Sequence, residues 1–170
     1  MKSDLKNEEK LLKELVSNYN VKGRIQRERR IWINTDKEKL ISICKFVKEK
    51  GFDHLSAISV TDWLKEGEYE ITYHLWSYKR KILLTIKIRV SRKNPSAPSV
   101  SAIWDRNAQI HEREMHEMFG VEFKGNDDLA PLFLENWQNS PPFRKDFDWR
   151  EYVKKECYNK DNEREIVYHE

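Results

Sequence analysis

The sequence has few cysteines, and none of them lies in a metal-binding pattern. Its 170 residues include two, Cys44 and Cys157, which are far apart and form no Cys-x-x-Cys or mixed Cys/His set. Structural disulfides and thiolate-bound metals both need cysteines that are paired or closely spaced. We therefore expect a reduced intracellular chain that holds no iron–sulfur cluster.

Long hydrophobic runs are also missing. No stretch stays apolar for the roughly 18 residues that a membrane helix needs. The first residues, from Met1 to Glu8, are mostly polar and lack the hydrophobic region of a signal peptide. We expect any attachment to a membrane to come through partner proteins.

Motifs of an independent enzyme are absent as well. The sequence contains no glycine-rich phosphate loop, no dinucleotide fingerprint and no activated Ser or Cys arrangement. His111, Glu112 and His116 form an HExxxH pattern, but five helical residues rotate about 140° off register, so the two rings point to different faces. We predict that this chain has no catalytic, cofactor-binding or metal-binding residue.

Charge is abundant and nearly balanced. Charged residues make up 36% of the chain, and 32 basic against 29 acidic residues give a net charge of +3. Such a composition is typical of proteins from hot environments, so we expect a thermophilic source. The strongly basic run, which adjoins Trp32, contains Lys22, Arg24, Arg27, Arg29 and Arg30. It leaves a stand-alone RNA-binding module as an alternative, although the balanced charge disfavours nucleic acid and favours a solvated strand edge.

Apolar residues recur at helical spacing in three segments. The predicted helices end near residues 18–20, run from 36 to 50, and run from 101 or 102 to 119. Thr35 and Glu38 have the sequence of a capping box before the second helix. Gly51 and Gly120 follow the second and third helices, where glycine supplies the left-handed stop.

Alternation of apolar and polar residues predicts strands. The predicted strands are 23–33, 52–62, 68–77 and 82–90. The short connection at 78–80 makes the last two a hairpin, and the proline-bearing segment 94–99 is expected to be a loop. The fold class is therefore α+β, with a mainly antiparallel sheet, helices packed on one face, and an extended C-terminal arm.

We place the domain at residues 1–120 and the arm at residues 121–170. Residues 121–150 have little periodicity but contain two tryptophans and four phenylalanines, too many aromatics for a disordered linker. We expect a partner protein to cover them. The polar residues 151–170 are expected to form a frayed or extended tail.

The most specific pattern lies between His111 and Phe147. A Glu-Arg-Glu helix runs into a Phe-Gly stop, and an Arg-Lys-Asp-Phe turn follows about two dozen residues later. The residues expected to form this structural signature or an interface are Glu112, Arg113, Glu114, Phe119, Gly120, Trp137, Phe143, Arg144, Lys145, Asp146 and Phe147. Ordinary ion pairs on a helix surface, or a carboxylate cluster for acid–base work, would also be consistent with the helix charges.

This ordered combination resembles the signature of the 30 kDa subunit family of respiratory complex I, over roughly residues 103–149. The family also supplies a small soluble subunit to membrane-bound nickel–iron hydrogenases and related ion-pumping complexes. Respiratory members usually carry Gly-His-Pro-Asp-Leu-Arg-Arg where this chain has Gly-Asn-Asp-Asp-Leu-Ala-Pro at 125–131. We therefore expect a hydrogenase-type or archaeal relative, in which the Glu and Arg of the helix fix the arm.

The resemblance implies a non-catalytic assembly subunit on the cytoplasmic side of the cell membrane. The implied complex is a ferredoxin-dependent hydrogenase or a sulfur-reducing relative; the alternative is a complex I-like NADH, F420H2 or ferredoxin:quinone dehydrogenase. The implied partners are a hydrogenase-like large subunit, an iron–sulfur small subunit and membrane subunits. Those partners would hold the iron–sulfur clusters and, in a hydrogenase, the nickel–iron centre. The sequence names neither the electron donor and acceptor nor the pumped ion.

Overall fold

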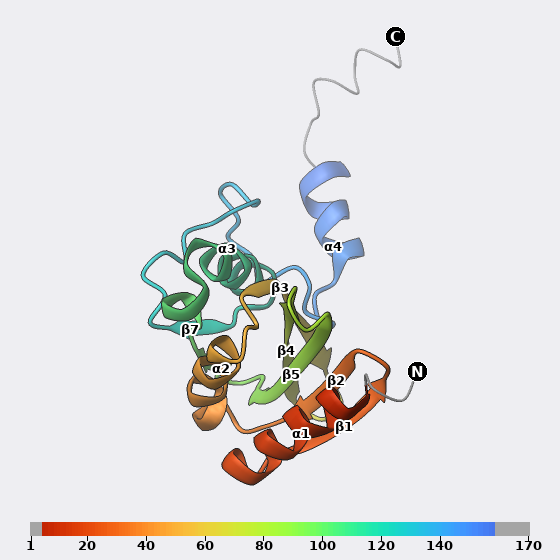
Figure 1. Ribbon diagram of the computed structural model, residues 1–170. Coiled ribbons are helices and arrows are strands. Elements are labelled where there is room, and N and C mark those ends of the chain that lie inside the picture. The colour runs from red at the N-terminus through yellow and green to blue at the C-terminus, as the bar shows by residue number, and fades with distance from the viewer. Residues whose placement is uncertain (1–4, 159–170) are drawn as a thin grey trace.

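A computed structural model describes residues 5–158, which form a five-stranded sheet, a two-stranded sheet and several helices (Figure 1). In chain order the elements are α1 (Leu5–Tyr19), β1 (Lys22–Arg27), β2 (Arg30–Asn34), the 3₁₀ turn η1 (Lys37–Lys39), α2 (Leu40–Glu49), β3 (His54–Trp63), β4 (Glu68–Ser77), β5 (Ile82–Ser91), β6 (Ser96–Pro98), α3 (Ser101–Phe119), β7 (Glu122–Lys124), α4 (Trp149–Val153) and the π-helical turn η2 (Lys154–Tyr158).

The large sheet has the strand order β1-β2-β5-β4-β3. Every neighbouring pair is antiparallel except β2 and β5, which run parallel. The predicted hairpin is confirmed, with Ser77 opposite Ile82 and Glu68 opposite Ser91. The α+β class with a mainly antiparallel sheet is thus confirmed.

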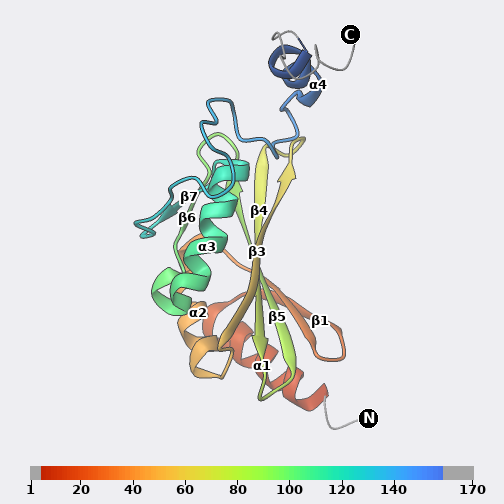
Figure 2. The same cartoon turned by 90° about the horizontal axis from the view of Figure 1, so that it is seen from above.

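One face of this sheet carries the core. Ile71, Tyr73 and Leu75 of β4 and Leu84 and Ile86 of β5 are at most 1% exposed, because alternate residues point to the same side. Helices α1, α2 and α3 pack on that side, and Figure 2 shows no helix of the described chain over the opposite face. That opposite face carries mostly polar and aromatic side chains, of which Thr72 and Thr85 are buried and His74 and Trp76 are half-buried. No described helix is both long enough and apolar enough to cross a membrane.

The predicted helix over residues 36–50 is observed as η1 and α2, but its predicted capping box is wrong. Asp36 is the residue at the N-cap of η1, and it makes no side-chain capping bond. The hydroxyl of Thr35 is buried without a hydrogen-bond partner among the described residues. The segment leaves β2 still bonded to β5, with the Thr35 amide donating to the Lys87 carbonyl at 3.0 Å, and this pairing places the threonine one residue before the N-cap Asp36.

Three other segments differ from the sequence-based expectation. The single strand predicted over 23–33 is a hairpin, β1 and β2, whose turn is made possible by Arg29 at φ 61°. The loop predicted over 94–99 contains β6, which pairs parallel with β7. Of the expected tail 151–170, residues up to 158 are helical, in α4 and η2, and the remainder lies outside the described residues.

The first residues after Gly120 belong to the packed core. Val121 is fully buried and Phe123 is 1% exposed, while β7 closes the small sheet with β6. The rest of the arm runs along α3 and past the end of the large sheet before α4, which lies at the end of the molecule away from α1 and β1 (Figures 1 and 2). The division of the chain between residues 120 and 121 stays a prediction.

Candidate interface arm and the charges that hold it

Glu112 on α3 is a fully buried carboxylate. It accepts hydrogen bonds from the Ser99 hydroxyl and the Val100 amide, both at 2.7 Å, and from the Asn126 side-chain amide at 2.9 Å. Burial raises its pKa, and the three donors oppose that rise. One side chain thus joins the segment before α3, the helix itself and the start of the arm.

Arg113, the next residue, faces the arm from the outside of the helix. Its guanidinium donates to the carbonyls of Ala130 at 3.0 Å and Pro131 at 3.1 Å, and it pairs with the Asp128 carboxylate at 3.1 Å. The planar fork of arginine suits this geometry, since it can donate in several directions at once. The segment 125–131, whose sequence differs from that of respiratory members, is therefore bonded directly to the Glu-Arg-Glu helix.

Glu117, one turn further on, accepts backbone amides of the arm. The amides of Leu132, Phe133 and Leu134 donate to its two oxygens at distances from 2.7 to 3.2 Å. Glu114 takes a different part, because it is partly exposed and lies 4.0 Å from His111. Three charged residues of α3 thus hold successive segments of the arm.

The Phe-Gly stop also meets the arm. Gly120 has φ 77°, and a Cβ there would lie 3.0 Å from Cγ of Pro141, so a larger residue would be both strained and crowded. Phe119 packs edge-on against Phe143 with ring centroids 5.8 Å apart. The Phe143 amide donates to the Met118 carbonyl at 2.9 Å.

Past Phe143, the Arg-Lys-Asp-Phe turn is fixed to the sheet by a network of charges. Arg92, at the end of β5, pairs with Asp62 of β3 at 2.7 and 2.9 Å and with Asp146 at 2.7 and 3.3 Å. Arg144 also pairs with Asp146, through two bonds of 3.0 Å. The Lys145 amide donates to Asp62 at 2.9 Å.

The electrostatics of this network favour the charged forms. Hydrogen bonds from Arg144, and then from Arg92, hold the pKa of Asp146 well below its ordinary value. The hydrogen bonds that Arg92 donates to Asp146 and to Asp62 raise the pKa of Arg92. Asp62 is 3% exposed and accepts hydrogen bonds from Arg92 and from the Lys145 amide, so the turn is held by the protein's own sheet.

An aromatic cluster follows the turn, formed by Trp137, Phe147, Trp149 and Tyr152. Neighbouring ring centroids within it lie 5.0 to 6.1 Å apart. The Trp149 indole donates to the Pro142 carbonyl, and Trp137 donates to that of Ser140. These contacts pack the first turn of α4 against the preceding part of the arm, although Trp149 remains 45% exposed.

Other aromatic side chains of the arm face solvent. Phe133 is 62% exposed and Phe143 58% exposed, while the backbone amides of both are bonded to α3. A rigid backbone that presents uncovered phenylalanine and tryptophan rings is typical of a protein–protein contact. The arm is thus a preformed surface.

No metal site brings the two histidines of the HExxxH pattern together. His116 contacts the Val121 carbonyl at 2.9 Å, whereas His111 lies beside Glu114. No group of three or more His, Cys, Asp or Glu side chains with the geometry of a metal site occurs in residues 5–158. The thiol of Cys44 is buried, and burial raises its pKa well above the ordinary value.

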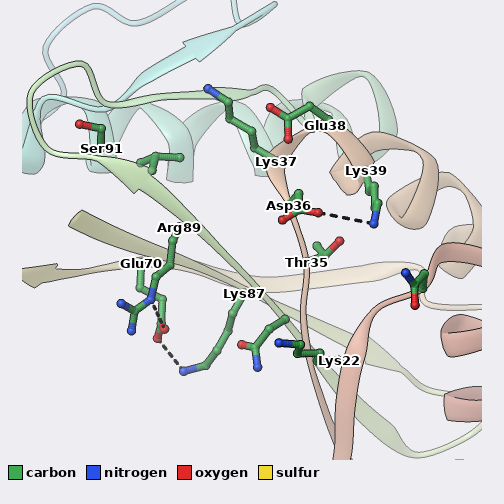
Figure 3. A pocket seen from close by; sticks show the side chains of 13 residues that line it. Lys22, Thr35, Asp36, Lys37, Glu38, Lys39, Glu70, Lys87, Arg89 and Ser91 are labelled. Atoms are coloured by element: carbon green, nitrogen blue, oxygen red, sulfur yellow. Dashed lines mark hydrogen bonds and ion pairs between the residues drawn. The ribbon is translucent and has the colours of Figure 1, made fainter. Parts of the chain in front are cut away.

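The basic run is divided between both strands of the first hairpin. Arg24 lies 5.2 Å from the centre of the Trp32 ring, and Lys87 of β5 lies 5.1 Å from the same centre. Lys22 lines a polar hollow of about 670 Å³ at the end of β2 (Figure 3). Among the described residues, this is a second charged feature, and its lining residues lie outside the arm.

Sequence reasoning missed Arg92 and Asp62, the residues that anchor the turn. They are far apart in the chain, and neither interrupts the local pattern, so no short motif identifies them. The burial of Glu112 did leave a signal, because it shares a helix face with Ala108 and Met115, which are also buried.

Taken together, the fold and the arm define a class: a small α+β protein whose C-terminal arm is bonded to its own helix and sheet and leaves several aromatic rings exposed. Residues 33–153 match the family described as "Respiratory-chain NADH dehydrogenase, 30 Kd subunit". The chain belongs to this family, whose members are subunits of complex I-like respiratory complexes.

Individual relatives agree with this assignment. The chain is 37% identical over 122 residues to a subunit of the F(420)H(2) dehydrogenase of Methanosarcina mazei, covering 70% of this chain and 76% of the relative. It is 38% identical over 122 residues to a subunit of the NADH-quinone oxidoreductase of Rhizobium meliloti, covering 69% and 66%. Among solved structures, a chain of the membrane-bound sulfane sulfur reductase, an archaeal respiratory membrane complex, superposes with a TM-score of 0.81 at 31% identity, covering 92% of this chain and 94% of that one.

Proposed function

We propose that this chain is a non-catalytic assembly subunit in the cytoplasmic arm of a membrane-bound, ion-translocating oxidoreductase. The observation that carries the proposal is that the C-terminal arm of this chain has a fixed backbone and exposed aromatic rings. Its backbone is fixed by Glu112, Arg113, Glu117 and Arg92, yet Phe133 and its other exposed rings lack cover. Ordering before binding lowers the entropy that association costs, which suits a permanent contact.

The proposed partners are a hydrogenase-like large subunit, an iron–sulfur small subunit and membrane subunits. These chains would hold the iron–sulfur clusters and, in a hydrogenase, nickel and iron, while this chain would hold no cofactor. The signature and arm residues from Glu112 to Phe147 would act as the structural and contact elements. Attachment to the membrane would then come entirely through the partners.

Two observations bear on the type of complex. The likeness to a chain of the sulfane sulfur reductase supports a ferredoxin-dependent hydrogenase or a sulfur-reducing relative. The run at 125–131, which lacks the His and Arg residues of respiratory members, supports the same branch. The identity to the F(420)H(2) dehydrogenase relative supports the alternative, a complex I-like NADH, F420H2 or ferredoxin:quinone dehydrogenase.

Purification from the native host tests the proposal. The chain would be tagged, the membranes solubilised in mild detergent, and the eluate examined by visible absorbance and mass spectrometry. We expect an assembly that contains an iron–sulfur chromophore and membrane subunits. Recovery of the chain alone, or with RNA whose release depends on salt, would instead support a stand-alone binding module.

A further inference from the structure

The large sheet has a notch at the end of β2. Pairing between β2 and β5 ends with Asn34 opposite Lys87, whereas β5 continues to Ser91 with β4 as its only strand partner. The chain after Asn34 turns away through η1 toward α2. The space left beside the last residues of β5 is the hollow of about 670 Å³ (Figure 3).

The side chains around the notch carry an excess of positive charge. The five basic ones are Lys22, Lys37, Lys39, Lys87 and Arg89, against the three acidic ones Asp36, Glu38 and Glu70. Lys87 and Arg89 pair with Glu70 at 2.7 and 3.5 Å, and Lys39 pairs with Asp36 at 3.4 Å. Lys22 and Lys37 have no ion-pair partner in the part of the chain that the structure describes.

The polar surface of the notch extends beyond these two lysines. Asn34, which lies opposite Lys22 in the sheet, is exposed. A second hollow of about 360 Å³ shares Lys22, Asn34 and Lys87 with the notch and reaches Trp32. The two hollows form one continuous basic surface with an aromatic ring at one end.

We propose that this basic notch, together with Trp32, binds an extended acidic segment of a neighbouring protein. Figure 3 shows Lys37 on one side of the hollow and Lys22 and Lys87 on the other, and the hollow of about 670 Å³ is much larger than one small anion. Residues of an extended segment are spaced by about 3.3 Å, so successive acidic side chains can reach both sides. Charge complementarity of this kind selects the partner.

The acidic residues of the notch disfavour nucleic acid. A continuous phosphate backbone would lie against Glu70 and Glu38, whereas a protein segment can place its carboxylates only at the lysines. The notch is lined by side chains outside the arm, although Ser91 at its edge directly precedes Arg92, which bonds Asp146 of the arm. The inference rests on the proposed function in one respect, that the neighbour is another protein of the same complex.

Binding to the free full-length chain gives the first test. The probes would be a ten-residue poly-glutamate peptide, inorganic phosphate and a short single-stranded RNA, measured by titration at low salt. We expect the peptide to bind, and the double variant Lys22→Glu, Lys37→Glu to weaken it at least about tenfold. The matched control, Lys13→Glu with Lys45→Glu, makes the same charge change on exposed positions of α1 and α2 and should have little effect. An equal loss in both variants, or a preference for phosphate or RNA, would overturn the proposal.

Lysine labelling in the purified membrane complex gives the second test. We expect Lys22 and Lys37 to be acetylated much more slowly in the complex than in the free chain, with Lys13 unchanged, and to form carbodiimide cross-links to carboxylates of a neighbouring protein. Equal acetylation rates of Lys22 and Lys37 in the intact complex and in the free chain would refute the proposal that the notch binds a partner. The proposed assembly role would still stand. Failure of the chain to enter any complex, by contrast, would refute the assembly role itself.

Discussion

Replacing Arg92 by Met should destabilise the isolated protein far more than replacing the arginine three positions earlier. Arg92 has a side chain 10% exposed and neutralises Asp62, whose side chain is 1% exposed. Removing one partner of a buried pair costs about 3–5 kcal/mol, because the other charge is left without compensation. Asp62 would keep the Lys145 amide, so we expect the lower end, about 3 kcal/mol.

Arg89 supplies the matched control. It lies on β5 and bonds Glu68 at 2.9 Å, but the two side chains are 43% and 41% exposed. Its second partner, Glu70 at 3.5 Å, keeps Lys87 at 2.7 Å when Arg89 is replaced. Such surface pairs are worth at most about 1 kcal/mol, and Arg89→Met should cost no more than that. For a protein of this size the two expectations correspond to melting-temperature losses of roughly 6–12 °C and at most about 4 °C.

Urea denaturation followed by circular dichroism would measure both variants, because urea, unlike guanidinium, leaves charges unscreened. The double variant Asp62→Asn, Arg92→Met should lose less than the sum of the single losses, since the two residues share one interaction. A cost near 1 kcal/mol for both Arg92→Met and Arg89→Met would contradict the buried-network account. An additive double variant would contradict it too.

Three further outcomes are expected. Arg144→Ala should weaken assembly strongly, as the co-purification yield would show. It should barely change the melting temperature of the free chain in thermal unfolding, because its partner Asp146 is 43% exposed and keeps Arg92. Burial raises the pKa of Glu112, so its contribution to stability is greatest below the unfolded pKa of about 4.3 and is lost as pH rises through the folded value. Wild type should therefore lose stability relative to Glu112→Gln as pH rises above about 4.3, as urea titrations at several pH values would show. The purified chain should carry no redox cofactor, and a stoichiometric iron–sulfur absorbance or metal content would refute this.

The helices and most strands could be predicted because the local sequence pattern of each one reflects which of its residues are buried. In β4 and β5, alternation marks the buried face directly, and Gly120 marks the end of α3 because its positive φ favours glycine. The hairpin β1–β2 was missed since its turn at Glu28 and Arg29 contains no Gly, Pro or Asn. Arg29 takes the positive φ there, and an arginine gives no sequence signal for that conformation.

The anchoring of the arm could be predicted only in part. The family signature drew attention to Arg144 and Asp146, but their partners Arg92 and Asp62 are brought close only by the tertiary fold. The same holds for the notch, whose lysines come from β1, η1 and β5. Contacts between distant segments depend on strand order and register. Periodicity within one segment shows which face is buried, but it does not show which strand lies beside it.

The account rests most heavily on the claim that the exposed rings of the arm contact partner proteins. Its most direct test is the amount of partner protein that co-purifies with Phe133→Ser and with Phe133→Ser combined with Trp149→Ser, compared with Tyr78→Ser. Tyr78 is 68% exposed, close to the 62% of Phe133, but it lies in the β4–β5 turn, at the other end of those strands. We expect the arm variants to remain folded and to lose at least about tenfold of the partner, with no loss for Tyr78→Ser. Full recovery of the partner by the folded double variant would contradict the claim.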